Sequence, residues 1–212
     1  MNKVFSKMFA WLFAGILLSF GVAMFVIKQE DLLVKIYTTG IYYVIIIAEL
    51  ITVFVLSSRI YKMSFTGAII AYLLYAFLTG LTLSAIFVIY DITSIIYAFG
   101  VTAGLVLIFG LLGYFTKLDL TKFSTYLFMG LIGLIICEII NIFVGSQTFN
   151  FVLLILGVII FIGYIAFDIQ KVKENIYGLD EDKLPILGAL ELYMDFINVF
   201  IRLLELFGKR RD

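Results

Sequence analysis

Seven long apolar segments dominate this chain of 212 residues. They lie at about 8–27, 36–57, 65–89, 95–115, 124–145, 150–169 and 186–207. Each is close to the roughly 20 residues that a helix needs to cross a bilayer. Because lipid offers no partner for backbone N–H and C=O groups, segments of this length cross the membrane as α-helices. The sequence therefore predicts an all-α, polytopic membrane bundle of seven helices, forming one domain over residues 1–212.

Composition agrees with a membrane protein and excludes several functions. The chain is 64% hydrophobic and 14% charged, whereas soluble domains have about 25% charged residues. Its net charge is zero and no basic patch is present, which argues against a nucleic-acid partner. Histidine is absent, so no imidazole binds a metal or titrates near neutral pH. The single cysteine, Cys137, excludes an intramolecular disulfide. We expect a lipid bilayer around the chain and no bound cofactor.

The distribution of Lys and Arg predicts the orientation of the chain. With the amino terminus in the cytoplasm, only Lys28 and Lys35 of the loops between segments lie outside. Nine cationic residues then lie inside, namely Lys3, Lys7, Arg59, Lys62, Lys117, Lys122, Lys171, Lys173 and Lys183. The tail Lys209–Arg211 opposes the rule, so a last segment that dips in and returns is the alternative to a full crossing. We expect a full crossing of a plasma or inner membrane, because residues 186–207 give about 33 Å of helix.

The last segment carries a polar stripe. Its polar residues are spaced 4, 3, 4 and 3 apart and share one helix face: Glu191, Asp195, Asn198, Arg202 and Glu205. Ionisable groups at membrane depth usually face a bundle interior or a water-filled path. The stripe therefore predicts an interior helix that lines something wet or ionic. Arg202 and Glu205 are also placed to neutralise each other.

Four acidic residues lie within the apolar segments: Glu49, Glu138, Asp168 and Asp195. A neutral carboxyl that hydrogen-bonds between helices is the structural alternative, above all for Glu49 and Glu138. Asp168 and Asp195 lie on consecutive segments and would titrate as a unit if they meet. Such a pair is suited to sensing protons, to binding Ca²⁺ or to acting as a catalytic dyad.

Arg59, at the inner end of the second segment, is the expected counter-ion of Asp168, and a snorkelling arginine is the alternative. Asp195 lies about 15 Å along its helix, whereas Asp168 lies near the predicted end of its own. Contact between them requires the sixth segment to continue into 170–175, or the seventh to begin inside the interface.

Four motifs resemble the Bax inhibitor-1 family, also called transmembrane Bax-inhibitor-motif proteins. The motifs occur in the family's order and, with the seven segments, cover most of the chain. They are Thr79-Gly-Leu-Thr-Leu-Ser84, Thr102-Ala-Gly with Gly113-Tyr-Phe-Thr-Lys117, Ala166-Phe-Asp-Ile-Gln170, and Ala189-Leu-Glu-Leu-Tyr-Met-Asp-Phe-Ile-Asn198.

The resemblance implies six helices around a central seventh and a non-enzymatic, pH-sensitive, passive Ca²⁺ leak. Asp168 and Asp195 would then be the pH-sensing pair, with Ca²⁺ as the transported ion, and Arg59 would match the latch by position. Phe167 and Ile169 stand where relatives often carry Tyr and Thr, which changes the polarity of the site.

Two other functions stay open at this point. In the first, the chain regulates a membrane-protein partner, such as a quality-control protease, as some bacterial relatives are thought to do. An intramembrane aspartyl protease also uses two aspartates, but its Gly-x-Gly-Asp motif is replaced here by Leu-Tyr-Met-Asp at 192–195, and no proline follows.

Overall fold

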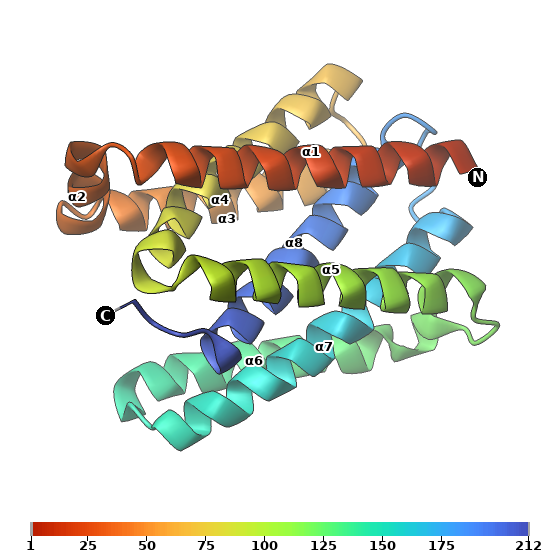
Figure 1. Cartoon of the computed structure of the whole chain (residues 1–212). Helices are drawn as coiled ribbons and strands as arrows, with labels where there is room; N and C mark the ends of the chain where they lie inside the picture. The colour runs from red at the N-terminus through yellow and green to blue at the C-terminus, as the bar shows by residue number, and fades with distance from the viewer. Residues whose placement is uncertain (1, 212) are drawn as a thin grey trace. The chain divides into compact units, whose positions relative to one another are not determined.

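The computed structural model describes residues 2–211, which form eight α-helices and one short 3-10 helix (Figure 1). The helices are α1 (Asn2–Val26), α2 (Glu30–Thr38), α3 (Ile41–Arg59), α4 (Phe65–Ile89), α5 (Ile92–Phe115), η1 (Leu120–Phe123), α6 (Ser124–Val144), α7 (Gln147–Glu174) and α8 (Leu184–Phe207). Within this range, β-pairing is limited to one isolated bridge between Tyr90 and Arg210. Seven of the helices are long and apolar enough to cross a membrane. The predicted all-α, seven-span membrane protein is confirmed.

The helix ends differ from the approximate predicted boundaries by several residues, and two of these differences have a clear cause in the backbone. The second segment was expected to begin at residue 36, but α2 ends at Thr38 and α3 begins at Ile41. Gly40 separates them with φ +78°, a left-handed conformation that interrupts a right-handed helix. The sixth segment was expected to end at 169, but α7 continues to Glu174 and is capped by Asn175 at φ 45°. This extension was one of the two ways in which Asp168 was expected to reach Asp195.

The chain divides into two compact units. The first comprises Met1–Asp91, Tyr177–Tyr193 and Arg210–Asp212, and the second comprises Ile92–Ile176 and Met194–Lys209. Helix α8 contributes its first half to one unit and its second half to the other. A single membrane domain over 1–212 stays a prediction.

In the first unit, α1 and α3 both pack against α4. The two largest fully buried side chains are Tyr72 and Tyr193, whose rings pack edge to face at 6.2 Å. The Tyr193 hydroxyl lies 2.6 Å from Oγ of Ser19 on α1, so this polar pair is satisfied inside an apolar core. The Tyr37 hydroxyl of α2 accepts a hydrogen bond from the Ala85 amide of α4 at 3.0 Å. The same hydroxyl lies within donating distance of the Leu81 and Thr82 carbonyls of α4.

In the second unit, α7 packs against both α5 and α6. The second half of α8 is buried here through Phe196, Val199, Phe200 and Leu204, and Phe196 meets Phe99 of α5 at 5.2 Å. Of the most apolar stretch of α8, 78% is buried, against 6–44% for the other six spans. This burial agrees with the interior position predicted from the polar stripe. That the other six helices surround α8 stays a prediction.

Candidate functional site

Asp168 of α7 and Asp195 of α8 belong to the same compact unit and are both nearly buried. Their exposed fractions are 4% and 5%. Asp168 lies six residues before the end of α7 at Glu174, whereas the sequence predicted that the helix would end at about residue 169. The hydroxyl of Tyr164, one turn before Asp168, is within electrostatic reach of both carboxyl groups and of Lys171. The second unit therefore holds two nearly buried aspartates, one on α7 and one on α8.

Lys171 supplies the positive charge at this site. Its Nζ lies 2.7 Å from Oδ1 of Asp168, and the lysine side chain is only 14% exposed. The same ammonium lies 4.7 Å from the centre of the Phe167 ring. Sequence reasoning chose Arg59 as the counter-ion and missed Lys171, although spacing by three residues places Lys171 on the same helix face. Arg59 is exposed in the last turn of α3, in the first unit, so its latch role stays a prediction.

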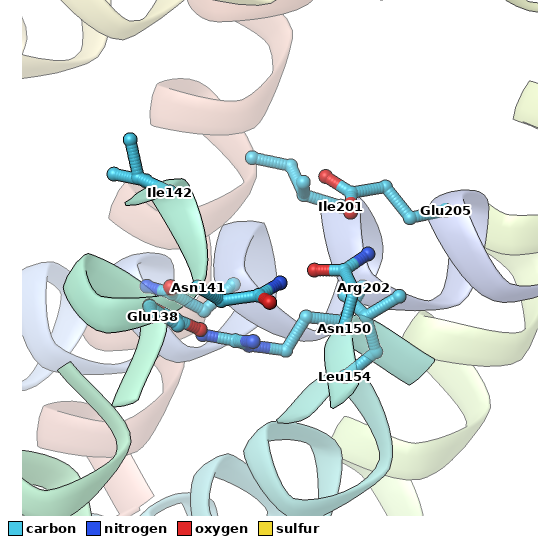
Figure 2. Close-up of a pocket in the computed structure, with 9 residues that line it drawn as sticks. Glu138, Asn141, Ile142, Asn150, Leu154, Ile201, Arg202 and Glu205 are labelled. Carbon is cyan, nitrogen blue, oxygen red and sulfur yellow. The ribbon is translucent and has the colours of Figure 1, made fainter. Parts of the chain in front are cut away.

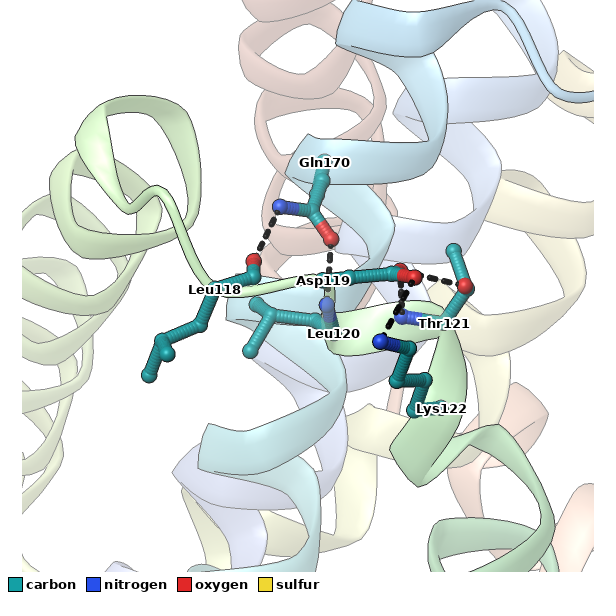
Figure 3. A network of polar contacts seen from close by, with 6 residues as sticks. All are labelled: Leu118, Asp119, Leu120, Thr121, Lys122 and Gln170. Atoms are coloured by element: carbon teal, nitrogen blue, oxygen red, sulfur yellow. Dashed lines mark hydrogen bonds and ion pairs between the residues drawn. The ribbon is translucent and has the colours of Figure 1, made fainter.

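Gln170 fastens the α5–α6 connection to α7 two residues beyond Asp168 (Figure 3). Its Nε2 donates to the Leu118 carbonyl at 2.8 Å, and its Oε1 accepts the Leu120 amide at 2.7 Å. Lys173 adds a bond from its Nζ to the Tyr114 carbonyl at 2.8 Å. The glutamine of the Asp-x-Gln motif is therefore a structural clamp beside the aspartate.

Asp119, in the same loop, caps η1 (Figure 3). It accepts hydrogen bonds from the Thr121 hydroxyl and, at 3.1 Å, from the Thr121 amide, and Lys122 lies 3.9 Å away. The Thr121 hydroxyl bond holds the pKa of the Asp119 carboxyl below its usual value. A lowered folded-state pKa gives stability that is complete above the unfolded value, about 3.9, and is lost as pH falls through the folded value.

We therefore expect Asp119→Asn to lower the thermal unfolding temperature by a constant amount from pH 5 to pH 8. The difference from the natural protein should shrink below about pH 4, where Asp119 itself becomes protonated. Thermal unfolding in detergent across this pH range measures it. If the difference in unfolding temperature instead changed between pH 6 and pH 7, Asp119 would not have the lowered pKa that its contacts with Thr121 indicate.

The part of the α8 stripe from Asp195 to Glu205 lies in the second unit, where Arg202 contacts α6 and α7 (Figure 2). Nη2 of Arg202 lies 2.7 Å from Oε1 of Glu138 on α6, and the guanidinium is 5.4 Å from the Phe161 ring of α7. Sequence spacing proposed Glu205 as the partner of Arg202. The ion pair found for Arg202 is with Glu138, and Glu205 and Asn198 line the same cavity.

The remaining predicted residues, Glu49 and Glu191, lie in the first unit. Glu49 of α3 accepts a hydrogen bond from the Thr82 hydroxyl of α4 at 3.2 Å, as the structural alternative for this residue expects. Glu191 accepts a 2.5 Å bond from the Tyr177 hydroxyl. The stripe is thus divided, because Glu191 belongs to one unit and the four later residues to the other.

Residues 2–211 contain no group of three or more Asp, Glu, Cys or His side chains that would hold a metal ion. A tightly bound metal therefore has no obvious cage in the part of the chain that the structure describes. Ca²⁺ binding by Asp168 and Asp195 stays a proposal.

Comparisons with known proteins match nearly the whole chain. A family model described as "Inhibitor of apoptosis-promoting Bax1" matches residues 1–212. The inner membrane protein YbhL of Escherichia coli (strain K12) is 40% identical over 213 residues, 97% of this chain and 91% of that protein. An uncharacterized protein of Borreliella burgdorferi is 37% identical, covering 100% and 94%. Protein RP147 of Rickettsia prowazekii, also uncharacterized, is 35% identical, covering 100% and 92%.

Proposed function

Because this chain belongs to the Bax inhibitor-1 family, we propose that it is a pH-sensitive, passive Ca²⁺ leak in a plasma or inner membrane. The observation that carries the proposal is the placement of Asp168 and Asp195. Both carboxyl groups are nearly buried within one compact unit, and they lie on two long apolar helices. Ionisable groups are costly at membrane depth and mark ion or proton paths by default.

Carboxyl groups are the natural proton sensors in this chain, because it has no histidine. Lys171 neutralises one carboxylate of the pair through its 2.7 Å contact with Asp168. When both aspartates are ionised, the group of three carries one net negative charge. Uptake of one proton by the pair removes that net charge. In the proposed closed state Arg59 pairs with the ionised Asp168 as a latch, so protonation of the aspartate weakens the latch.

Ca²⁺ is the proposed cargo because carboxylate oxygens are the hard ligands that it prefers. Beyond Asp195, the stripe on α8 continues through Asn198, Arg202 and Glu205, which line a cavity. These residues offer polar groups along about 10 Å of helix within the second unit. Passage of an ion requires binding that is weak enough to reverse, which fits the lack of a three-carboxylate cage in residues 2–211.

The proposal assigns the two aspartates to ion passage rather than to peptide hydrolysis. The sequence before Asp195 lacks the glycine-rich motif of intramembrane aspartyl proteases. Regulation of a membrane-protein partner is the other function that the family resemblance allows, and the experiment below separates it from a leak.

Purified protein in liposomes that contain a Ca²⁺ dye should show a passive influx that changes several-fold between pH 6 and pH 8. Asp195→Asn should flatten this pH profile, since one carboxyl of the pair can no longer titrate. Asp119→Asn is the matched control, because this exposed loop carboxylate is ionised throughout the range. Influx equal to that of empty liposomes, or an unchanged profile in Asp195→Asn, would refute the leak. A silent protein that co-purifies with a stoichiometric membrane partner would favour regulation.

A further inference from the structure

A polar cavity of about 350 Å³ opens in the second unit where α6 ends, α7 begins and α8 ends (Figure 2). Six of its nine lining residues are polar: Glu138, Asn141, Asn150, Asn198, Arg202 and Glu205. Glu138 lies six residues, or about 9 Å, before the end of α6 at Val144. The cavity therefore extends along α6 from the helix end toward its middle and is lined there by polar groups. In a membrane protein this indicates access for water and ions.

The cavity offers oxygen ligands. Glu138 and Glu205 provide carboxylates, and the asparagines provide carbonyl oxygens. Asn198 uses its Nδ2 to donate to the Met194 carbonyl at 2.9 Å, which leaves its Oδ1 for the cavity. In Figure 2 the amides of Asn141 and Asn150 and the carboxylate of Glu205 lie around one opening, while Arg202 reaches toward Glu138. Hard divalent cations such as Ca²⁺ and Mn²⁺ prefer such ligands.

Arg202 is the positively charged residue that lines this cavity. Its side chain is only 10% exposed, and within the described part of the chain it forms an ion pair with Glu138. Among residues 2–211, its Nε has no hydrogen-bond partner. Gly157 of α7 makes room for it, because a Cβ there would lie 2.4 Å from Cζ and Nε of the arginine. The guanidinium thus rests on one carboxylate and on the Phe161 ring, and not on a complete set of acceptors.

We propose that this cavity is a vestibule for divalent cations, in which Arg202 competes with the incoming cation for Glu138. Two carboxylates and one resident positive charge make a weak site, as an ion in transit requires. Arg202 lies two helical turns, about 10 Å, from Asp195 on the same stripe. The vestibule's place in ion passage rests on the leak proposed above, whereas cation binding by the cavity stands without it.

Mn²⁺ binding to the detergent-purified full chain tests this site, because electron paramagnetic resonance detects loss of the free-ion signal. The natural protein should bind Mn²⁺ weakly. Arg202→Gln should bind one Mn²⁺ about tenfold more tightly, because a competing charge has been removed at close range. Adding Glu138→Gln to that variant should return the affinity to the weak level. Equal affinities in all three proteins would overturn the proposal.

Gly157→Ala provides a second test that leaves every charge in place. The added methyl group should push the guanidinium away from Glu138 and tighten Mn²⁺ binding several-fold. Gly133→Ala on α6 is the matched control, since its Cβ would meet nothing within 4 Å. Tighter binding in both glycine variants, or in neither, would contradict displacement of Arg202. Ca²⁺ flux is read separately, so tighter binding without any flux would overturn the leak and leave the vestibule standing.

Discussion

Replacing Gly113 with alanine is expected to destabilise the protein by about 3 kcal/mol, the upper end of the usual cost of overpacking a core. The new Cβ would lie 2.1 Å from the Ala166 carbonyl oxygen and 2.8 Å from the Ala166 Cα. Both contacts are with the backbone of α7, so no side chain can rotate away to relieve them. Relief therefore requires α5 and α7 to move apart.

Gly104→Ala on the same helix is the control for this substitution. A Cβ at Gly104 would meet no atom within 4 Å. Alanine in place of glycine within a helix is favourable by about 0.5–1 kcal/mol, so this variant should unfold at the same or a slightly higher temperature. Thermal unfolding in detergent compares the two variants. Equal losses would show that the α5–α7 contact is looser than the structure indicates.

The Gly113 contact also bears on the proposed sensor. Ala166 precedes Asp168 by two residues, and Gln170 clamps the connection that follows α5. A shift of α7 against α5 would therefore move Asp168 relative to this loop. For the flux assay, Gly113→Ala is consequently a perturbation of the site and not a neutral control.

The membrane fold could be predicted from the sequence because the bilayer imposes one strong rule on long apolar segments. The interior position of α8 followed from the stripe for the same reason, since lipid does not solvate Asp195 or Arg202. The start of the second span could not be predicted from hydropathy. Gly40 ends the regular helix through its backbone conformation, and the apolar pattern runs across it without a change.

The counter-ions of the site were harder to predict than its carboxylates. Helical spacing identified Glu205 as a neighbour of Arg202, but spacing describes contacts within one helix only. The Glu138 contact comes from another helix, and it depends on the gap that Gly157 leaves in α7. Lys171 follows Asp168 by three residues, so helical spacing predicts their contact. Lys171 was used only as a marker of the inner membrane boundary, and this pair was therefore missed.

Glu138→Gln is expected to cost about 3 kcal/mol of stability, whereas Arg202→Gln should cost about 1 kcal/mol. The asymmetry follows from burial, because the Arg202 side chain is 10% exposed and that of Glu138 is 38% exposed. Removing the glutamate leaves a nearly buried guanidinium without its carboxylate. Removing the arginine leaves a carboxylate that water in the cavity can still solvate.

The double variant Glu138→Gln, Arg202→Gln should be less destabilised than the sum of the two single variants, because it leaves no unpaired charge behind. Thermal unfolding of the four proteins completes the cycle, and we expect a coupling of about 1–3 kcal/mol between the two sites. Additive losses would mean that the 2.7 Å ion pair contributes nothing beyond its separate side chains. Strong coupling would instead identify Arg202 as the charge that neutralises Glu138, which is the condition for a divalent cation to compete with it.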